Sequence, residues 1–399
     1  MEGIHILGLG NLGKYVAYAL MQRCQQAAAR QMAATGSAAM SRPIIFPAPT
    51  LLFHRSGLLA DWEASGRSIR CATPNTRVGS SGAGETRSEG FHVELLAGAT
   101  SANPELEGRS EGIKYLVVAT KAHATAAALA PLRGRLNRGS HILFLQNGMG
   151  KFQSPAPSTL LGQADLTRHS GVSDEVSTKV FVDQTIRPTY WTGICSAGVY
   201  SESPFSIVHA GRGPLTIGMS ETLSHAVPGS SPQNPMAAQL LDAAILETSV
   251  VSPDEILQAQ LKKLVINSVV NPLTALYKCK NGEVFDSAVA RKVADQLLQE
   301  AGVIIRAILG SRSEGGRPTT LAAFTDEKLH EYVNEVVQKT ANNTSSMLQD
   351  VQAGRQTEID YINGYLVQQA KSMGLPHKQH EEIVQMIKQQ SRCKQDRDA

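Results

Sequence analysis

Residues 3–13, GIHILGLGNLG, decide the fold of the first part of this chain. Residues 3–9 are a short apolar run rich in Ile and Leu, which is typical of a buried parallel strand. From Asn11 onward the composition is helical, with apolar side chains on one face. A strand, a glycine turn and a helix in this order begin a βαβ unit.

The turn between that strand and that helix has the pattern G-x-G-x-x-G, at Gly8, Leu9, Gly10, Asn11, Leu12 and Gly13. In such a turn the first glycine permits the tight bend, the second lets the backbone approach a pyrophosphate, and the third lets helix and strand pack closely. Phosphates bind at the helix N-terminus that follows. Because the motif lies between a predicted strand and a predicted helix, we expect these six residues to bind a dinucleotide in a Rossmann-type domain.

The end of the second strand normally discriminates between the two nicotinamide dinucleotides. That strand is predicted at residues 49–54 and is followed by Arg55, with no acidic residue before Asp61. An Asp or Glu would hold the ribose 2′-hydroxyl of NAD, whereas an Arg accommodates the 2′-phosphate of NADP. Arg55 therefore favours NADP(H) as the cofactor, and the alternative is an arginine that is merely solvated at the surface.

The pattern of elements divides the chain into two parts. Strand-like and helix-like segments alternate in residues 1–226, as in a doubly wound sheet. Residues 227–235 are rich in Pro, Gly and Ser, which is typical of a linker. Helical periodicity without strand-like runs continues through residues 236–399. We expect an α/β N-terminal Rossmann domain followed by an all-α C-terminal domain.

Two segments of the predicted Rossmann domain lack any apolar period. Residues 73–91 are polar and rich in glycine, and residues 151–175 are also polar. Both compositions are typical of surface loops. In the helical part, one continuous helical pattern covers residues 326–351.

Composition and charge exclude several classes of protein. Hydrophobic residues make up 42% of the chain, and 38 basic against 35 acidic residues leave a formal net charge of +3. So small an excess does not indicate a nucleic acid or membrane partner. No apolar run approaches the roughly 18–20 residues that span a bilayer. The five cysteines are dispersed, with no C-x-x-C, which argues against a zinc site or a disulfide framework and favours a reducing compartment. We therefore expect the protein in the cytoplasm, with a mitochondrial location left open.

One predicted helix carries a line of polar residues. In LKKLVINSVVNPLTA, residues 261–275, the side chains of Lys263, Asn267 and Asn271 are spaced four residues apart and share one face. A structural hydrogen-bond network would explain the asparagines alone. A substrate-binding face would also explain the lysine, which can protonate a developing alkoxide. The adjacent Lys262 points about 100° away around the helix.

Six segments together resemble the ketopantoate reductase (2-dehydropantoate 2-reductase) family. They are GLGNLG at 8–13, ATKAH at 119–123, QNGMG at 146–150, KLVINSVVNPLTAL at 263–276, NGE at 281–283 and SSMLQDVQAGRQTEIDYING at 345–364. Their order matches the family across nearly the whole chain. The resemblance implies a Rossmann domain joined to a helical domain, and the NADPH-dependent reduction of ketopantoate to pantoate for pantothenate and coenzyme A synthesis.

The resemblance also implies roles for individual residues. Lys263 matches the catalytic lysine of the family, which is the proton donor. The matches to substrate-binding positions are Asn147, Asn267, Asn271, Asn281 and Ser346. The matches to cofactor-contacting positions are Lys121, Asn147 and Glu358, together with Arg55 at the 2′-phosphate. On pattern alone, the segment that holds Ser346 and Glu358 could also be an exposed charged helix and turn.

Three insertions, near 25–48, 73–110 and 151–185, are longer than in compact bacterial members and resemble those of divergent fungal relatives. One alternative to ketopantoate reduction is therefore the NADPH-dependent reduction of another 2-keto acid. The other is a non-catalytic NADP-binding sensor or interaction protein. We expect a small-molecule 2-keto acid as ligand, no bound metal and no nucleic acid, and the helical domain could support a homodimer.

Overall fold

The computed structural model describes residues 2–34, 47–73, 84–96, 111–149, 172–220, 234–311 and 321–398. It contains two compact units. The first holds residues 1–146 and 176–256, and the second holds residues 147–175 and 257–399. Most of the predicted linker, residues 227–233, lies outside the described residues, so the predicted domain boundaries stay predictions.

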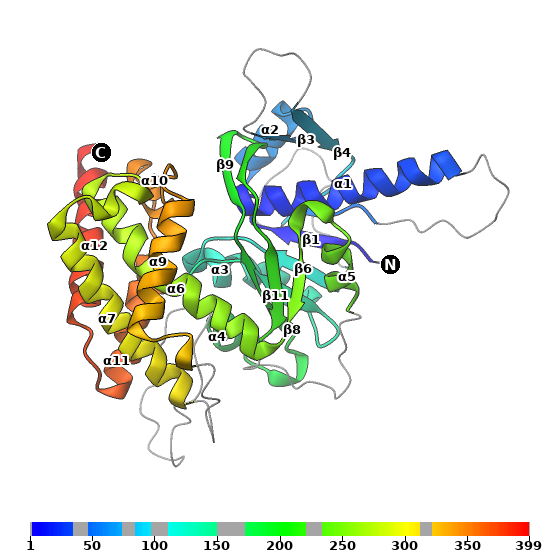
Figure 1. Cartoon of the computed structure of the whole chain (residues 1–399). Helices are drawn as coiled ribbons and strands as arrows, with labels where there is room; N and C mark the ends of the chain where they lie inside the picture. The colour runs from blue at the N-terminus through cyan, green and yellow to red at the C-terminus, as the bar shows by residue number, and fades with distance from the viewer. Residues whose placement is uncertain are drawn as a thin grey trace. The chain divides into compact units, whose positions relative to one another are not determined.

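The first unit is built on a sheet whose strands β1, β6, β8 and β11 are labelled in Figure 1. This sheet has eight strands in the order β12-β11-β8-β7-β6-β1-β2-β5. Its strands are β1 (Ile4–Leu7), β2 (Thr50–Phe53), β5 (His92–Leu95), β6 (Tyr115–Val118), β7 (His141–Phe144), β8 (Thr189–Cys195), β11 (Leu215–Met219) and β12 (Ser249–Val251). All neighbours from β5 to β8 are parallel. Counted along the chain, these six strands have the doubly wound order 3-2-1-4-5-6. The predicted fold class is confirmed.

The helices of the first unit connect these strands. They are α1 (Asn11–Ala34), α2 (Ser56–Ala64), α3 (Thr125–Leu129) and α5 (Pro235–Leu241), with 3-10 turns η2 (Ala122–Ala124), η3 (Ala130–Arg135), η4 (Gln184–Ile186) and η6 (Ala244–Leu246). A further helix, α4 (Val172–Lys179), has its first four residues in the second unit and the rest in the first. It begins inside the predicted loop at 151–175, so that prediction is wrong for residues 172–175. Residues 150–171 lie outside the described part of the chain.

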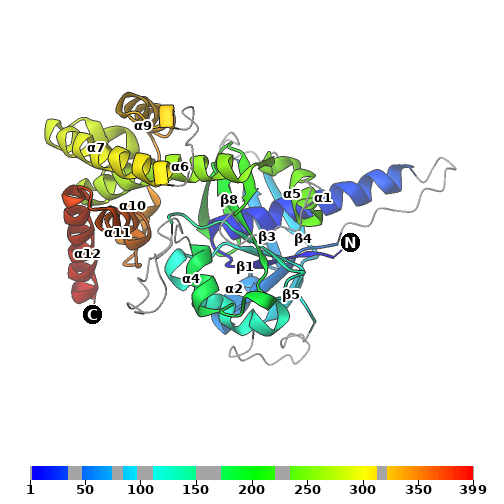
Figure 2. The same cartoon turned by 90° about the horizontal axis from the view of Figure 1, so that it is seen from below.

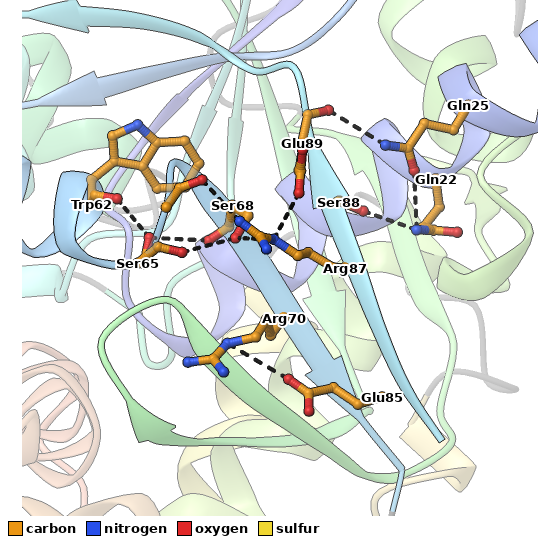
Figure 3. A network of polar contacts seen from close by, with 11 residues as sticks. Gln22, Gln25, Trp62, Ser65, Ser68, Arg70, Glu85, Arg87, Ser88 and Glu89 are labelled. Atoms are coloured by element: carbon orange, nitrogen blue, oxygen red, sulfur yellow. Dashed lines mark hydrogen bonds and ion pairs between the residues drawn. The ribbon is translucent and has the colours of Figure 1, made fainter. Parts of the chain in front are cut away.

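A second sheet in the same unit has the order β4-β3-β10-β9. Its strands are β3 (Ser68–Ala72), β4 (Glu85–Glu89), β9 (Gly198–Ser203) and β10 (Ser206–Gly211). Polar contacts hold β4 against β3 and α1 (Figure 3). Arg87 Nε donates to Ser68 Oγ at 2.8 Å, and Gln22 of α1 donates to Ser88 Oγ at 2.9 Å. The prediction of a loop at 73–91 is therefore wrong for β4. Its side chains are exposed except Ser88, so no apolar alternation marks it as a strand.

The second unit is helical among its described residues (Figure 2). Its helices are α6 (Pro253–Tyr277), which begins in the first unit, α7 (Ala288–Ser311), α9 (Asp326–Lys339), α10 (Ser346–Gln352), α11 (Asn363–Met373) and α12 (Lys378–Asp398), with 3-10 turns η7 (Asn281–Phe285) and η8 (Ile359–Tyr361). They surround one apolar core that includes Leu264, Leu297, Ile305 and Leu366.

Two predictions for the helical part are wrong in detail. The continuous pattern at 326–351 is divided into α9 and α10. The second helix begins afresh because Ser345 Oγ accepts a hydrogen bond from Leu348 N at 3.1 Å, which is an N-cap. A strand also occurs after residue 235: β12 is parallel to β11, at the edge of the main sheet.

Candidate functional site

The glycine turn between β1 and α1 is shaped by close backbone approach. Gly8 has φ +95°, and a Cβ there would lie 2.5 Å from the Thr120 nitrogen. A Cβ on Gly13 would overlap the Gly8 carbonyl oxygen and lie 3.3 Å from Ala119 Cβ. Apart from its own chain neighbours, no atom of the described residues lies within 4 Å of a Cβ placed on Gly10. Packing therefore requires Gly8 and Gly13, whereas Gly10 leaves open space at the N-terminus of α1, where phosphates bind.

The other three residues of the turn have different surroundings. Leu9 is buried in the core of the first unit, and Leu12 packs against it. Their side chains therefore serve packing, and a cofactor would meet their backbone. Asn11 is the first residue of α1, and its Oδ1 accepts a hydrogen bond from Ser201 Oγ of β9 at 2.6 Å.

Lys14, in the first helical turn of α1, directly follows the glycine turn and was not among the residues predicted from the sequence. Its Nζ donates to Ser201 Oγ at 2.5 Å, and the residue is only 6% exposed. Burial lowers the pKa of Lys14 from 10.5 to about 8. Among the described residues no carboxylate pairs with it. The available signal was its position directly after the glycine motif, in GLGNLGK.

Arg55 lies two residues after the end of β2 and directly before α2. Its side chain is exposed and forms no ion pair with a described residue. The adjacent His54 is also exposed, and partial desolvation together with the Arg55 charge lowers the pKa of His54. This placement suits the recognition of a 2′-phosphate. It also fits a solvated arginine, so its role stays a prediction.

Lys121 lies at the carboxyl end of β6, directly before η2. Its carbonyl accepts from Thr125 Oγ1 at 3.1 Å, and Gln146, after β7, donates to the same hydroxyl at 2.7 Å. Because β1, β2 and β6 are parallel neighbours, their carboxyl ends share one edge of the sheet. The first unit thus brings the glycine turn, Arg55 and Lys121 to the edge where doubly wound sheets bind ligands.

In the second unit, α6 presents two asparagine amides one helical turn apart. Asn267 and Asn271 are 9% and 8% exposed. Neither side-chain amide has a hydrogen bond to any residue that the structure describes. A structural network would pair both groups. Within the described part of the chain, the two amides therefore keep donors and acceptors that a ligand can satisfy.

Two adjacent lysines on α6 have different surroundings. Lys263 is half-buried and lies one turn before Asn267, on the face of the two asparagines. Lys262 Nζ lies 5.9 Å from the centre of the Tyr332 ring on α9, which is the distance of a cation–π contact. The geometry therefore favours Lys263 over Lys262 as the cation of this face.

Asn281 begins η7. Its Nδ2 donates to Thr340 Oγ1 at 3.1 Å, and its Oδ1 is buried without a hydrogen-bond partner among the described residues. Such an acceptor is costly unless a ligand satisfies it.

Ser346 is exposed at the first position of α10, next to the buried cap Ser345. Ser345 Oγ bonds to Thr274 Oγ1 at 2.6 Å, which holds the start of α10 against α6.

The turn after β7, which carries Asn147, is packed on the segment that follows Glu358. Met149 N donates to Tyr361 O at 2.8 Å. Gly148 has φ +81°, and a Cβ there would lie 2.5 Å from the Tyr361 carbonyl oxygen. Glu358 is only 4% exposed. The second unit thus places the Asn147 turn against η8, which begins directly after Glu358.

Comparison with known proteins identifies the family. Models of the ketopantoate reductase PanE/ApbA family match residues 76–222, and models of its C-terminal part match residues 255–391. The 2-dehydropantoate 2-reductase of Yersinia pestis is 30% identical over 275 residues, which are 69% of this chain and 73% of that protein. The chain belongs to the ketopantoate reductase family. Its members are oxidoreductases that act on a CH–OH group.

A fungal relative of this chain has a different substrate in its name. The ketoisovalerate reductase of Beauveria bassiana is 27% identical over 413 residues, covering 94% of this chain and 80% of that protein. Two solved structures share the fold. D-mandelate dehydrogenase with NADH and anilino(oxo)acetate has a TM-score of 0.67 at 14% identity, covering 98% of this chain and 99% of that one. The probable 2-dehydropantoate 2-reductase PanE of Bacillus subtilis has a TM-score of 0.59 at 23% identity, covering 98% and 100%.

Two further findings concern this family member within its described residues. No group of three His, Cys, Asp or Glu side chains is placed to hold a metal ion. None of the helices described combines the length and the apolar character needed to cross a membrane.

Proposed function

We propose that this member of the ketopantoate reductase family reduces ketopantoate to pantoate with NADPH and so supplies pantoate for pantothenate synthesis. The observation that carries the proposal is the polar face of α6. Two nearly buried asparagine amides, which form no side-chain hydrogen bond to a described residue, follow a half-buried lysine on the same face. A keto acid offers the carbonyl and carboxylate oxygens that such groups bind.

Each residue of this face has a defined part in the proposed reaction. Bound NADPH supplies the hydride that the ketone carbon accepts. Lys263 donates a proton to the ketone oxygen as a general acid, and its positive charge stabilises the negative charge that develops there. Asn267 and Asn271 orient the substrate by hydrogen bonds, and the exposed Ser346 hydroxyl donates to its carboxylate.

The residues of the first unit fit a dinucleotide. Among the described residues, Gly10 leaves open space at the N-terminus of a long helix, and Arg55 and Lys121 follow the carboxyl ends of β2 and β6. We propose that the glycine turn holds the pyrophosphate and that Arg55 pairs with the 2′-phosphate. Glu358 and Asn147 complete the proposed contacts with the cofactor.

A second candidate is the reduction of ketoisovalerate. It is favoured by the Beauveria relative, which matches 94% of this chain, whereas the Yersinia enzyme matches 69%. Ketopantoate carries a hydroxyl group that ketoisovalerate lacks. The buried Asn281 Oδ1 has no partner among the described residues, and a substrate hydroxyl would satisfy it. Because of this acceptor, we propose ketopantoate rather than ketoisovalerate as the substrate.

Steady-state kinetics with the full chain test the substrate. We expect kcat/KM with NADPH to be at least about tenfold higher for ketopantoate than for ketoisovalerate, because a site built for a hydroxyl rejects the analogue without it. The reverse ratio would assign the second candidate. Absence of turnover with both acids, with NADPH bound normally, would support the non-catalytic alternative.

Arg55→Ala tests the cofactor. Loss of a charge-assisted hydrogen bond costs about 1.5–3 kcal/mol, so the Kd for NADPH is expected to rise about 10- to 100-fold. The Kd for NADH should stay within about twofold, because NADH has no 2′-phosphate. Arg138→Ala is the matched control, because Arg138 is an exposed arginine before the amino end of β7. Equal weakening of both cofactors by Arg55→Ala would exclude this role.

A further inference from the structure

A proline interrupts the helix that carries the proposed substrate-binding face. Pro272 lies inside α6, directly after Asn271. Proline has no N–H, so the carbonyl four residues earlier, that of Ser268, loses its donor within the helix. Ser268 is fully buried. A buried carbonyl without a donor is costly, so another group must bond to it.

Asn363 supplies that donor from α11. Its Nδ2 donates to Ser268 O at 2.8 Å, across 95 positions of the sequence. Asn363 is itself fully buried at the first position of α11. Its side-chain amide therefore takes the place of the N–H that residue 272 lacks.

His380 of α12 fixes the orientation of this amide. Asn363 Nδ2 lies 3.0 Å from His380 Nδ1. One amide hydrogen bonds to Ser268 O and the other to the ring nitrogen, which must therefore be an unprotonated acceptor. Burial lowers the pKa of His380 to about 3, so the ring is neutral near pH 7.

Glu300 of α7 in turn anchors the start of α12. Its carboxylate accepts hydrogen bonds from the backbone N–H groups of Gln379 and His380 at 3.0 and 3.1 Å. A carboxylate at this end of a helix is also favoured by the helix dipole. The position of His380 is thus held from two neighbouring helices.

The bond to Ser268 lies in the turn that separates Asn267 from Asn271. We propose that Asn363 is a positioning residue, which replaces the missing donor of Pro272 and so keeps these two amides in register for the substrate. The inference rests on the proposed function of that face. A misplacement of substrate-binding groups by about 1 Å can lower the rate about 10²-fold. Loss of the bond from Asn363 to Ser268 O should therefore slow the reaction, although Asn363 does not contact the reacting atoms.

A double-mutant cycle with Pro272→Ala tests this proposal in the full chain. Alanine restores an N–H at position 272, so Ser268 O regains a donor within its own helix. We expect Asn363→Ala alone to lower kcat/KM for the keto acid by about tenfold or more. In the Pro272→Ala background the same substitution should lower it by less than about threefold, because the pair is coupled. The Kd for NADPH should change by less than about twofold in all four proteins, since the glycine turn and Arg55, which hold the phosphates in the proposed function, are in the other unit.

Gln390→Ala is the matched control. Gln390 Nε2 donates to Ala275 O at 3.0 Å, which is also a bond from a side-chain amide to an α6 carbonyl. That carbonyl is not the one that Pro272 deprives of a donor. The effect of Gln390→Ala should therefore be the same with and without Pro272→Ala. If the effect of Asn363→Ala is also the same in both backgrounds, Asn363 does not replace the proline donor.

Thermal unfolding of the same proteins gives a readout that needs no substrate. The fall in Tm caused by Asn363→Ala should be at least twice as large when Pro272 is present as in the Pro272→Ala background. If the Asn363→Ala variant does not fold, the double variant Asn363→Ala with Pro272→Ala is still expected to fold. A double variant that also does not fold would overturn the proposal. A wild-type chain that reduces no keto acid contradicts the proposed function, whereas additive effects in an active enzyme contradict the role of Asn363.

Discussion

Lys263→Ala is expected to lower kcat for the keto acid by at least about 10²-fold, the lower range for the removal of a general acid. Lys263 is the half-buried cation on the α6 face that carries Asn267 and Asn271. Without it, the alkoxide that forms on hydride transfer has neither a proton donor nor a neighbouring positive charge. The measurement is kcat at saturating NADPH and keto acid, together with the Kd for NADPH, which should change little.

Lys262→Ala is the matched control for this experiment. It removes a lysine from the same helix turn, but that lysine lies over the Tyr332 ring. The expected cost is about 0.5–1 kcal/mol of stability from the lost cation–π contact, with kcat within about twofold of wild type. Near-normal turnover by Lys263→Ala, or an equal loss in both variants, would remove Lys263 from the proposed mechanism.

Gly13→Ala is expected to destabilise the first unit strongly. The new methyl group would overlap the Gly8 carbonyl oxygen and would lie 3.0 Å from the Gly8 carbonyl carbon. Backbone atoms cannot move aside as a flexible side chain can, so α1 would have to shift away from β1. We expect a loss of about 3 kcal/mol or more, which corresponds to a fall in Tm of about 6–12 °C. Differential scanning calorimetry without cofactor measures this loss directly.

Gly10→Ala separates packing from cofactor binding in the same turn. A Cβ at this position meets no atom of the described residues within 4 Å beyond its chain neighbours, so the Tm without cofactor should stay close to that of wild type. The Kd for NADPH should rise about tenfold or more, since the methyl group stands where the backbone approaches the pyrophosphate. If Gly13→Ala were as stable as Gly10→Ala, the close packing of α1 on β1 would be refuted.

The local elements were predictable because they depend on patterns of neighbouring residues. An apolar run, a glycine turn and an amphipathic sequence pattern predict β1 and α1 independently of the rest of the chain. The i, i+4 spacing of Lys263, Asn267 and Asn271 places them on one face because a helix has 3.6 residues per turn. The identity of the turn glycines likewise follows from a motif.

Features that depend on contacts with residues distant in the sequence were not predictable from local patterns. The strand β4 pairs with β3 through its backbone, and its exposed side chains carry no alternation. The new helix start after Ser345 depends on a cap residue whose hydroxyl bonds to Thr274 of α6. Lys14 follows the motif in sequence, yet only the contact with Ser201 reveals that it is buried.

The sequence by itself determined the glycine turn, the composition of the two parts and the line of polar residues on α6, because these features are periodic and local. Only the tertiary structure decided which groups satisfy the polar atoms that such elements leave unpaired. The presence of Pro272 in the sequence predicts that Ser268 O loses its donor within the helix. The sequence does not predict that Asn363, which lies 95 positions away, donates to this carbonyl instead. Hydrogen-bond partners of buried backbone groups are selected by packing, and packing depends on the whole fold.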